Sequence, residues 1–384
     1  MKARNGQLIV GALAAAGAAI TVGRAAARRM RQRSNGASEP GAPSRVTVRA
    51  LAHTAQEPSD GVTHVPSRAT VQGPSREGPS RAYRLKRKED VADGIRRMAL
   101  GRADSAIDNL LGQATPDPEA AIHEARKDLK KLRSLLRLAR GALGEESYRA
   151  ENVRFRDAGR LLSGIRDAQV RHQTLLSLSE HYHGELDERT KAALTQALSA
   201  EAADSDSREG DDPRARASIE VVAGRAAIER WGLDGSGWDV IEDGLARIYA
   251  RGRARLDDVV ANPSDQNVHE WRKRVKDLWY HLRIIVRVWP EVMEGVADQA
   301  HELSDLLGDH HDLTVLRDHV GLRVVHDQVT PGGDGVGVED FRRLSNLVMR
   351  RQDELLARSI PLGRRLYAEK PNAFCKRMAG YWRA

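Results

Sequence analysis

The stretch "HEWRKRVKDLWYHLRIIVR", residues 269–287, mixes basic and apolar residues at the spacing of an amphipathic helix. On a helical wheel its basic face is made of His269, Arg272, Lys273, Lys276, Tyr280, Arg283 and Arg287. Like charges three or four positions apart destabilise a helix by about 0.2–0.5 kcal/mol for each pair. A solvated helix face usually interleaves acids with bases, and this face contains no acid. The face is therefore either a solvated surface that tolerates the repulsion or one wall of an anion-binding site.

A second stretch repeats this pattern 146 positions earlier, as "HEARKDLKKLRSLLRL", residues 123–138. Its basic face is made of His123, Arg126, Lys127, Lys130, Arg133 and Arg137. Two further matches lie at similar spacings, one between residues 161–170 and 305–315, and a fainter one between residues 93–98 and 243–248. We interpret the chain as two similar helical halves. Two basic faces at matching positions favour the anion-site reading, with both helices facing a shared central space.

The length of the basic face indicates the shape of the ligand. Fourteen residues of helix span about 21 Å, at about 1.5 Å of rise for each residue. A mononucleotide is much shorter than this, whereas an extended polyanion fits it. Arginine binds phosphate oxygens through paired hydrogen bonds, and lysine binds them as a point charge. Two such helices would form a positive groove that attracts a chain of phosphates.

Composition limits the function classes. The sequence has 30% charged and only 4% aromatic residues, with helical periodicity throughout the folded part, which predicts an all-α protein. The formal net charge is +8, but residues 1–34 supply seven positive charges and no acid, so the rest of the chain is nearly neutral. A bulk nucleic-acid binder usually carries a net basic domain. The lone cysteine, Cys375, excludes an internal disulfide and fits a reducing cytoplasm.

We predict three regions along the chain. Residues 1–34 form a basic tail, residues 35–82 form a disordered linker with four copies of Pro-Ser-Arg between residues 43 and 81, and residues 83–384 form the folded part. An acidic loop at 201–217 is predicted to join halves at about 83–200 and 218–384.

The tail contains an uninterrupted apolar run at residues 8–22. Its length falls short of the roughly 20 residues that a spanning helix needs. Three readings stay open: a weakly membrane-associated tail, a signal anchor that leaves the rest of the chain in the cytoplasm, and secretion. We expect a cytoplasmic protein, with association to a granule or N-terminal membrane anchoring as variants. The sequence does not determine the oligomeric state.

The doubled "HEARKDLKKLR" and "HEWRKRVKDLW" motifs, each followed by a segment with an aspartate, resemble the CHAD domain, the conserved-histidine α-helical domain. The resemblance covers roughly residues 83–384. It implies two four-helix bundles related by a pseudo-twofold axis around a basic pore, and binding of inorganic polyphosphate, in some members with association to polyphosphate granules. The motif positions carried over are His123, Arg126, Lys127, Lys130, Arg137, His269, Arg272, Lys273, Lys276 and Arg283.

The chain departs from a regular repeat at several points. Trp279 stands where the first copy has Arg133, Gly308 stands where it has Ser163, and one residue is lost between the motifs. CHAD domains are often fused to a triphosphate-tunnel catalytic domain, whose glutamate-rich signature is absent here. We therefore predict a non-enzymatic polyphosphate-binding protein without a cofactor.

Two alternatives are weighed against this prediction. The segment "GDHHDL", residues 308–313, with His301 and Asp305 before it, is similar to the His-Asp pair of metal-dependent phosphohydrolases. Its counterpart in the first half offers only Asp167, so we instead assign Asp167 and Asp312 a structural task, such as helix capping or orienting a basic residue. The other alternative is nucleic-acid binding, which the scarcity of aromatic residues for base stacking disfavours without excluding it.

Overall fold

The computed structural model describes residues 82–205, 212–329 and 336–384, and these residues belong to one compact unit. They form α-helices, one 3-10 helix and no strand, which confirms the predicted all-α class. The helices of the first part are α2 (Val91–Leu110), α3 (Pro118–Leu138), α4 (Arg140–Leu143), α5 (Glu145–Leu161), α6 (Gly164–His181), α7 (Glu188–Ser205) and α8 (Pro213–Ile228). Those of the second part are α9 (Asp239–Ala261), α10 (Asp265–Ile285), η1 (Val286–Val288), α11 (Pro290–Val329), α12 (Val338–Leu366) and α13 (Pro371–Arg383).

The two basic stretches are helices α3 and α10, and local sequence signals set their starts. Asp117 caps α3 by accepting from the backbone N–H groups of Glu119 and Ala120, and Pro118 occupies the first turn, where its missing N–H does no harm. Ser264 caps α10 by accepting from the N–H of Asn267. Each helix buries its apolar face, so its basic face turns away from the core.

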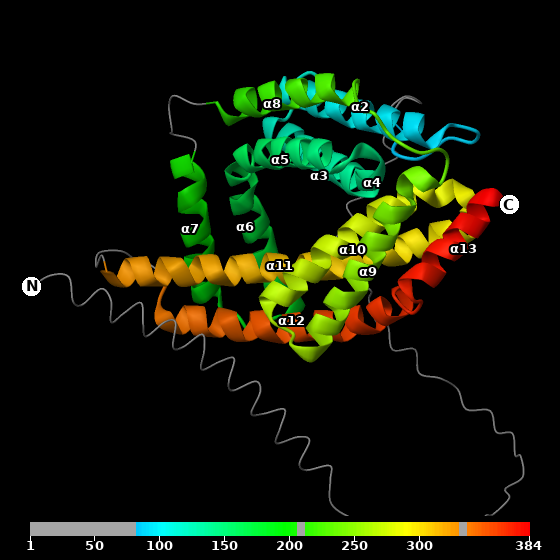
Figure 1. Cartoon of the computed structure of the whole chain (residues 1–384). Coiled ribbons are helices and arrows are strands. Elements are labelled where there is room, and N and C mark those ends of the chain that lie inside the picture. The colour runs from blue at the N-terminus through cyan, green and yellow to red at the C-terminus, as the bar shows by residue number, and fades with distance from the viewer. Residues whose placement is uncertain (1–81, 206–211, 330–335) are drawn as a thin grey trace, which may run out of the picture. The chain divides into compact units, whose positions relative to one another are not determined.

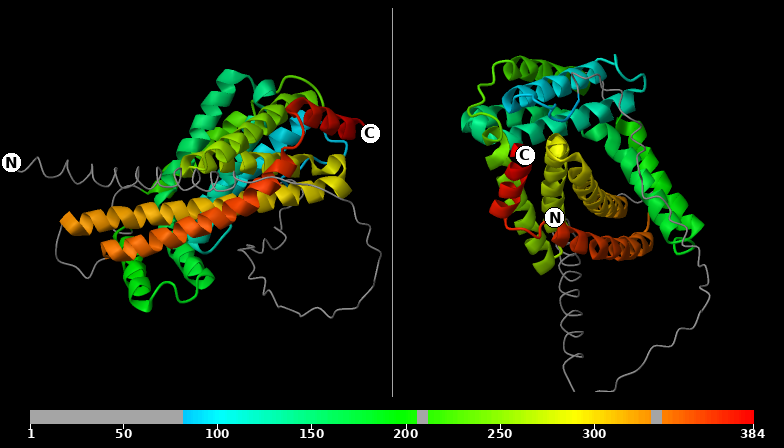
Figure 2. Two further views of the ribbon diagram at one scale, coloured as in Figure 1. Left: turned by 90° about the horizontal axis from the view of Figure 1, so that it is seen from below. Right: turned by 90° about the vertical axis from the view of Figure 1, so that its right-hand side faces the viewer.

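The helices pack into two groups that resemble the two predicted halves (Figure 1). In the first group α2 packs on α3 and α8, and α5 packs on α3 and α8. In the second group α10 packs on α9 and α11, and the long helices α11 and α12 lie side by side (Figure 2). The pair α6–α7 packs against α11, and Figure 1 shows it running across α11 and α12. A pseudo-twofold relation between the groups stays a prediction.

The boundary between the halves differs from the predicted one. The loop predicted at 201–217 is shorter, because α7 continues to Ser205 and α8 already begins at Pro213. Since α8 packs on α2 and α5, it belongs to the first group, and the connection between the groups follows it, at residues 229–238. The predicted tail and linker, including the apolar run 8–22, lie outside the described residues, among which no helix is long and apolar enough to cross a membrane.

A single hydrophobic core runs through both groups. At their junction His281, fully buried on α10, donates from Nε2 to the carbonyl oxygen of Ser134 on α3 at 3.0 Å. Arg137 of α3 pairs with Asp277 of α10 at 3.0 Å. Gly244 of α9 lies against the backbone of Leu138, where an added Cβ would come within 1.8 Å of the carbonyl oxygen. These contacts fix α3 against α9 and α10.

Candidate anion-binding site

The basic faces of α3 and α10 converge, because cations of each helix perturb the other. The pKa of Lys130 on α3 is lowered to about 7, first by loss of hydration and then by Lys276, Arg126 and Arg272. The pKa of Lys276 on α10 is lowered to about 8 by loss of hydration and by Arg272, with a smaller contribution from Lys127. Like charges from two helices at this proximity disfavour the protonated amines. Lys130 and Lys276 are therefore near enough for their charges to interact, while a central space shared by the two faces stays a prediction.

The side chain of Lys130 is exposed, although loss of hydration lowers the pKa of its amine. Exposure to water limits that loss of hydration, because water that reaches the exposed side chain keeps part of the hydration of the amine. The repulsion at Lys130 is therefore weaker than that of a lysine enclosed in the core.

The lysines at the middle of each face have no carboxylate partner, in contrast to their neighbours. Lys127 pairs with Glu124 at 2.9 Å, and Lys273 pairs with Glu270 at the matching position. In the part of the chain that the structure describes, Lys130 and Lys276 form no ion pair, and the buried Nε of Arg272 has no hydrogen-bond partner. We refer to Lys130, Lys276 and Arg272 as the central cluster. Its charges are the ones left for a ligand to neutralise.

Two equivalent arginines are held against the helices that follow each basic helix. Arg126 Nη1 donates to the carbonyl oxygen of Ser163, between α5 and α6, at 3.3 Å. Arg272 lies against Gly308 in α11, where an added Cβ would be 3.8 Å from its Nε. Ser163 and Gly308 are the positions that the repeat aligns, and each lies against the arginine at the matching position of its own half. The chain breaks its helix at Ser163 and continues it through Gly308.

Arg133 and Arg137, which we predicted to bind the ligand, are engaged by protein groups. Arg133 Nε donates to the side-chain oxygen of Asn152 at 3.1 Å, and its pKa falls to about 10 through loss of hydration and the nearby Arg137. Arg137 holds α3 to α10 through its ion pair with Asp277. The main role of Arg137 is therefore to link the two halves through this ion pair.

The far end of the α10 face is built around Trp279. Its ring stacks on His301 of α11 at 4.2 Å and on Tyr280 at 4.8 Å, while Lys276 and Arg283 lie over it at 5.8 and 5.5 Å. Cations over an aromatic face are attracted by its quadrupole, so Trp279 holds the two side chains in place. This gives a role to the residue that replaces Arg133 in the second copy.

Two predicted site residues lie away from the central cluster. Tyr280 is 3% exposed and meets Tyr83 edge-on at 6.0 Å, so it belongs to the core rather than to the wall. Burial accordingly raises its pKa. Arg287 is exposed in η1, beyond the end of α10.

The motif histidines lie near the start of each basic helix. His269 lies 4.3 Å from His311 of α11, measured between ring centroids, and the pKa of His269 is lowered by loss of hydration and by Lys273 and Arg272. The pKa of His311 falls to about 3 through loss of hydration and through Arg272. Both rings are therefore neutral near pH 7. His123 is partly exposed on α3.

Of the two aspartates given a structural task, Asp312 lies near enough to Lys130 and Lys276 to raise the pKa of each. That is the behaviour expected of a residue that supports the basic groups. Asp167 lies in the first turn of α6, and its side chain is outside the described residues.

The histidines and acids near residues 301–312 do not gather into a metal site. His301 stacks on Trp279 and lies 3.5 Å from Asp305, whereas His310 is buried and accepts a hydrogen bond at its carbonyl oxygen from Gln352. Within the described ranges no group of three or more His, Cys, Asp or Glu side chains is placed to hold a metal ion.

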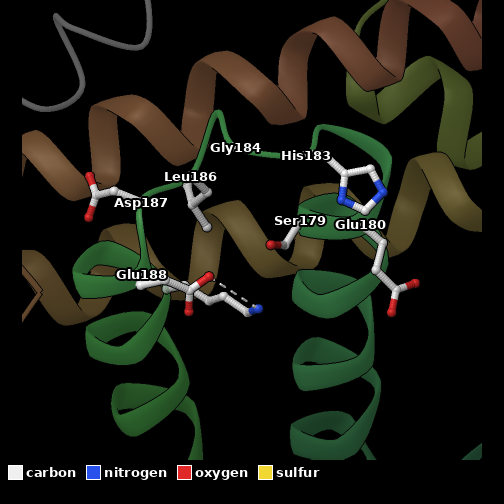
Figure 3. Close-up of a pocket in the computed structure, with 8 residues that line it drawn as sticks. Ser179, Glu180, His183, Gly184, Leu186, Asp187 and Glu188 are labelled. Carbon is white, nitrogen blue, oxygen red and sulfur yellow. Dashed lines mark ion pairs between the residues drawn. The ribbon is translucent and has the colours of Figure 1, made fainter.

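A surface pocket lies at the turn between α6 and α7, and no residue of the central cluster lines it (Figure 3). Glu180, Asp187 and Glu188 line it, and Lys191 is 3.9 Å from Glu188. An acidic lining repels phosphate, so this pocket does not suit the ligand that the basic helices attract.

The glutamates that neutralise Lys127 and Lys273 were missed in the sequence, although the signal was present. Each stands three positions before its lysine, which is a favourable ion-pair spacing on a helix. Asp305 lies on α11 and raises the pKa of Lys276 on α10. The sequence did not indicate that this aspartate supports the charge of Lys276.

Comparison with known proteins gives one family. No curated protein matches the chain. The family model of the CHAD domain matches residues 100–321, more than half of the sequence, and this range includes both basic helices. The chain therefore belongs to the CHAD domain family.

Proposed function

We propose that the protein binds linear inorganic polyphosphate at the central cluster, without catalysing its conversion. The observation that carries the proposal is the set of cations without carboxylate partners, which two helices bring together. A polyanion would relieve their mutual repulsion and replace the lost hydration. Membership in the CHAD family supports this ligand, and binding would also bring the protein to polyphosphate granules.

Nucleic acid is the weaker candidate for the same cluster. Trp279, over which Lys276 lies, is 7% exposed and stacks on His301 and Tyr280. It therefore offers no free face for a base to stack on.

The direct test is a titration with polyphosphates of graded length at several salt concentrations. We expect affinity to increase with chain length up to a plateau, because a longer chain fills more of the basic face. Single-stranded DNA of equal phosphate content serves as competitor. If DNA displaces polyphosphate at a lower phosphate concentration than the reverse, the proposed ligand is wrong.

Binding should consume protons near neutral pH. The lysine pKa values of about 7 and about 8 leave part of the amines neutral in the free protein, and phosphate favours their charged form. We expect uptake of about half a proton or more for each chain bound near pH 7.5, and affinity that falls as pH rises from about 7 to 9. Calorimetry in buffers of different ionisation enthalpy measures the uptake.

The same lysines affect the stability of the free protein, which depends on pH in the opposite sense to the affinity for polyphosphate. Their folded pKa values lie below the ordinary value of 10.5, so the unfolded chain binds more protons between about pH 7 and pH 10. Their contribution to stability therefore increases with pH across this window. If polyphosphate binding takes up no protons between about pH 7 and pH 9, these amines do not contact the ligand.

A further inference from the structure

Arginines on α12 meet the turn between α6 and α7. Arg350 donates from Nη1 to the carboxylate of Glu185 at 2.8 Å, and its Nη2 forms a second hydrogen bond to the same group. Arg343 pairs with Asp187, two residues further along the turn. The partners are 165 and 156 positions apart in the sequence, so these pairs join distant segments of the chain. The turn therefore places two carboxylates along α12.

The end of α6 also rests on α12, at the next arginine. Arg351 Nη1 donates to Glu354 of its own helix at 2.9 Å, and the same carboxylate accepts from the hydroxyl of Tyr182 at 2.7 Å. His181 Nε2 lies 2.9 Å from Glu354. The guanidinium of Arg350 lies over the ring of Tyr182, 3.8 Å from its centroid. We refer to Arg343, Arg350 and Arg351 as the α12 row.

The α12 row has the spacing and the exposure of a site for an extended anion. Arg343 and Arg350 are seven residues apart, which places them on one face of α12, about 10 Å apart along the helix axis. Each of these two side chains stays 47% exposed although it is paired. A guanidinium group that holds a carboxylate through two hydrogen bonds can hold a phosphate group in the same way.

We propose that the α12 row is a second binding site for a chain of phosphates, and that Glu185 and Asp187 occupy it as a competitor within the same chain. The ligand class rests on the proposed function, whereas the α12 row lies on a different helix from the lysines and the arginine of the central cluster. Exposed ion pairs are individually weak and are screened by salt. A short anion cannot displace two tethered carboxylates, but a long chain that offers many phosphates can.

The α12 row favours phosphate chains over single-stranded nucleic acid. Tyr182, which contacts the row, is 7% exposed, and Arg350 covers its ring. Its ring therefore offers no free face for a base to stack on. Single-stranded DNA of equal phosphate content is the comparison ligand. If freeing the row increases the affinity for DNA as much as the affinity for polyphosphate, the row does not select phosphate chains and the proposed ligand is wrong.

The test removes the two carboxylates and looks for a gain in binding. With Glu185→Gln and Asp187→Asn together, we expect the affinity for long polyphosphate to increase about threefold or more, because the ligand no longer competes with the turn. A turn that only supports the fold predicts no gain. Fluorescence anisotropy with labelled polyphosphate measures the change.

The matched control is Glu180→Gln with Glu188→Gln, which removes the same charge from residues at the same turn (Figure 3). Glu180 is exposed, and Glu188 lies 3.9 Å from Lys191 of its own helix. We expect the control to change the affinity by less than about twofold. Equal gains in the two proteins would reflect net charge alone and would overturn the proposal.

A second comparison asks whether the gain depends on the arginines. Arg343→Gln and Arg350→Gln, added to the two acid substitutions, should abolish it. Arg342→Gln and Arg364→Gln remove the same charge from α12 and should leave the gain in place, since Arg342 pairs with Glu339 of its own helix and Arg364 is exposed. If both pairs abolish the gain equally, the phosphate chain does not bind at the α12 row.

Hydrogen exchange tests the displacement in the natural sequence. Long polyphosphate should speed the exchange of the backbone amides at residues 182–187, because the turn leaves α12 when the ligand takes its place. Triphosphate at equal phosphate concentration should not have this effect. Unchanged or slower exchange in this segment with long polyphosphate would contradict the proposal.

A final comparison distinguishes this inference from the proposed function. The gain from Glu185→Gln and Asp187→Asn should persist when Lys130 and Lys276 are both replaced by methionine, since the α12 row is a separate site. If the gain requires these lysines, the row is not a separate site and the inference is wrong. If the lysine substitutions leave the affinity of the natural protein unchanged while the gain persists, the inference stands and the central cluster fails as a site.

Discussion

The double substitution Lys130→Met and Lys276→Met is expected to lower affinity for long polyphosphate by about 100-fold or more. Each charge-assisted hydrogen bond contributes about 1.5–3 kcal/mol. Lys130 is exposed and Lys276 is half-buried, and the two lie at the middle of the two basic faces. The same substitution should raise the melting temperature of the free protein, because it removes two cations whose charged forms are disfavoured. Fluorescence anisotropy with labelled polyphosphate and thermal denaturation measure the two effects.

The matched control is Lys370→Met and Lys376→Met, which removes the same net charge from two exposed positions at and near α13. We expect little change in affinity or melting temperature. If the control weakens binding as much as the central pair, long-range charge rather than the central cluster attracts the ligand.

Gly244→Ala is expected to destabilise the folded protein by about 3 kcal/mol or more, since overpacking against rigid backbone is among the most damaging changes. The new methyl group would lie 1.8 Å from the carbonyl oxygen of Leu138, and backbone at the end of α3 cannot rotate away as a side chain can. Polyphosphate affinity should fall in the fraction that remains folded, because α9 would be forced away from α3. Urea denaturation measures the free energy of unfolding.

Gly295→Ala is the control for this substitution. Gly295 is exposed within α11, and an added Cβ would meet nothing within 4 Å. Because alanine favours helix over glycine by up to about 1 kcal/mol, this change should stabilise the protein slightly. Equal stability of the Gly244→Ala protein and the natural protein would mean that α9 does not pack against Leu138 as closely as the structure has it.

The helical periodicity and the repeated motif were sufficient to predict the class of fold, and the two repeated helices, α3 and α10, contact each other. The prediction worked because charge periodicity and helix caps are local properties of the sequence. The repeat also matched Gly94 with Gly244, and both positions are crowded, although by different groups: Leu85 and Glu89 at the first and the backbone of Leu138 at the second. The two matched glycines are therefore both tightly packed, but against different groups.

Contacts between distant segments could not be read from a helical wheel. Arg137 lies on the basic face of α3, yet it pairs with an aspartate 140 positions later in the sequence. Tyr280 lies on the corresponding face of α10, yet Tyr83, which precedes the first helix of the structure, helps to bury it. The wheel gives the direction of a side chain but not the element that covers it.

Trp279 has a consequence for how a ligand would be oriented. With Trp279 in one half and Arg133 in the other, the two ends of the positive surface differ in chemistry. Linear polyphosphate is the same molecule when its ends are exchanged, so reversing it in the site gives an indistinguishable complex. An uneven site therefore cannot impose polarity on such a chain, and both ends are equally competent to enter first. The two halves could diverge in sequence without losing any arrangement of the bound polymer.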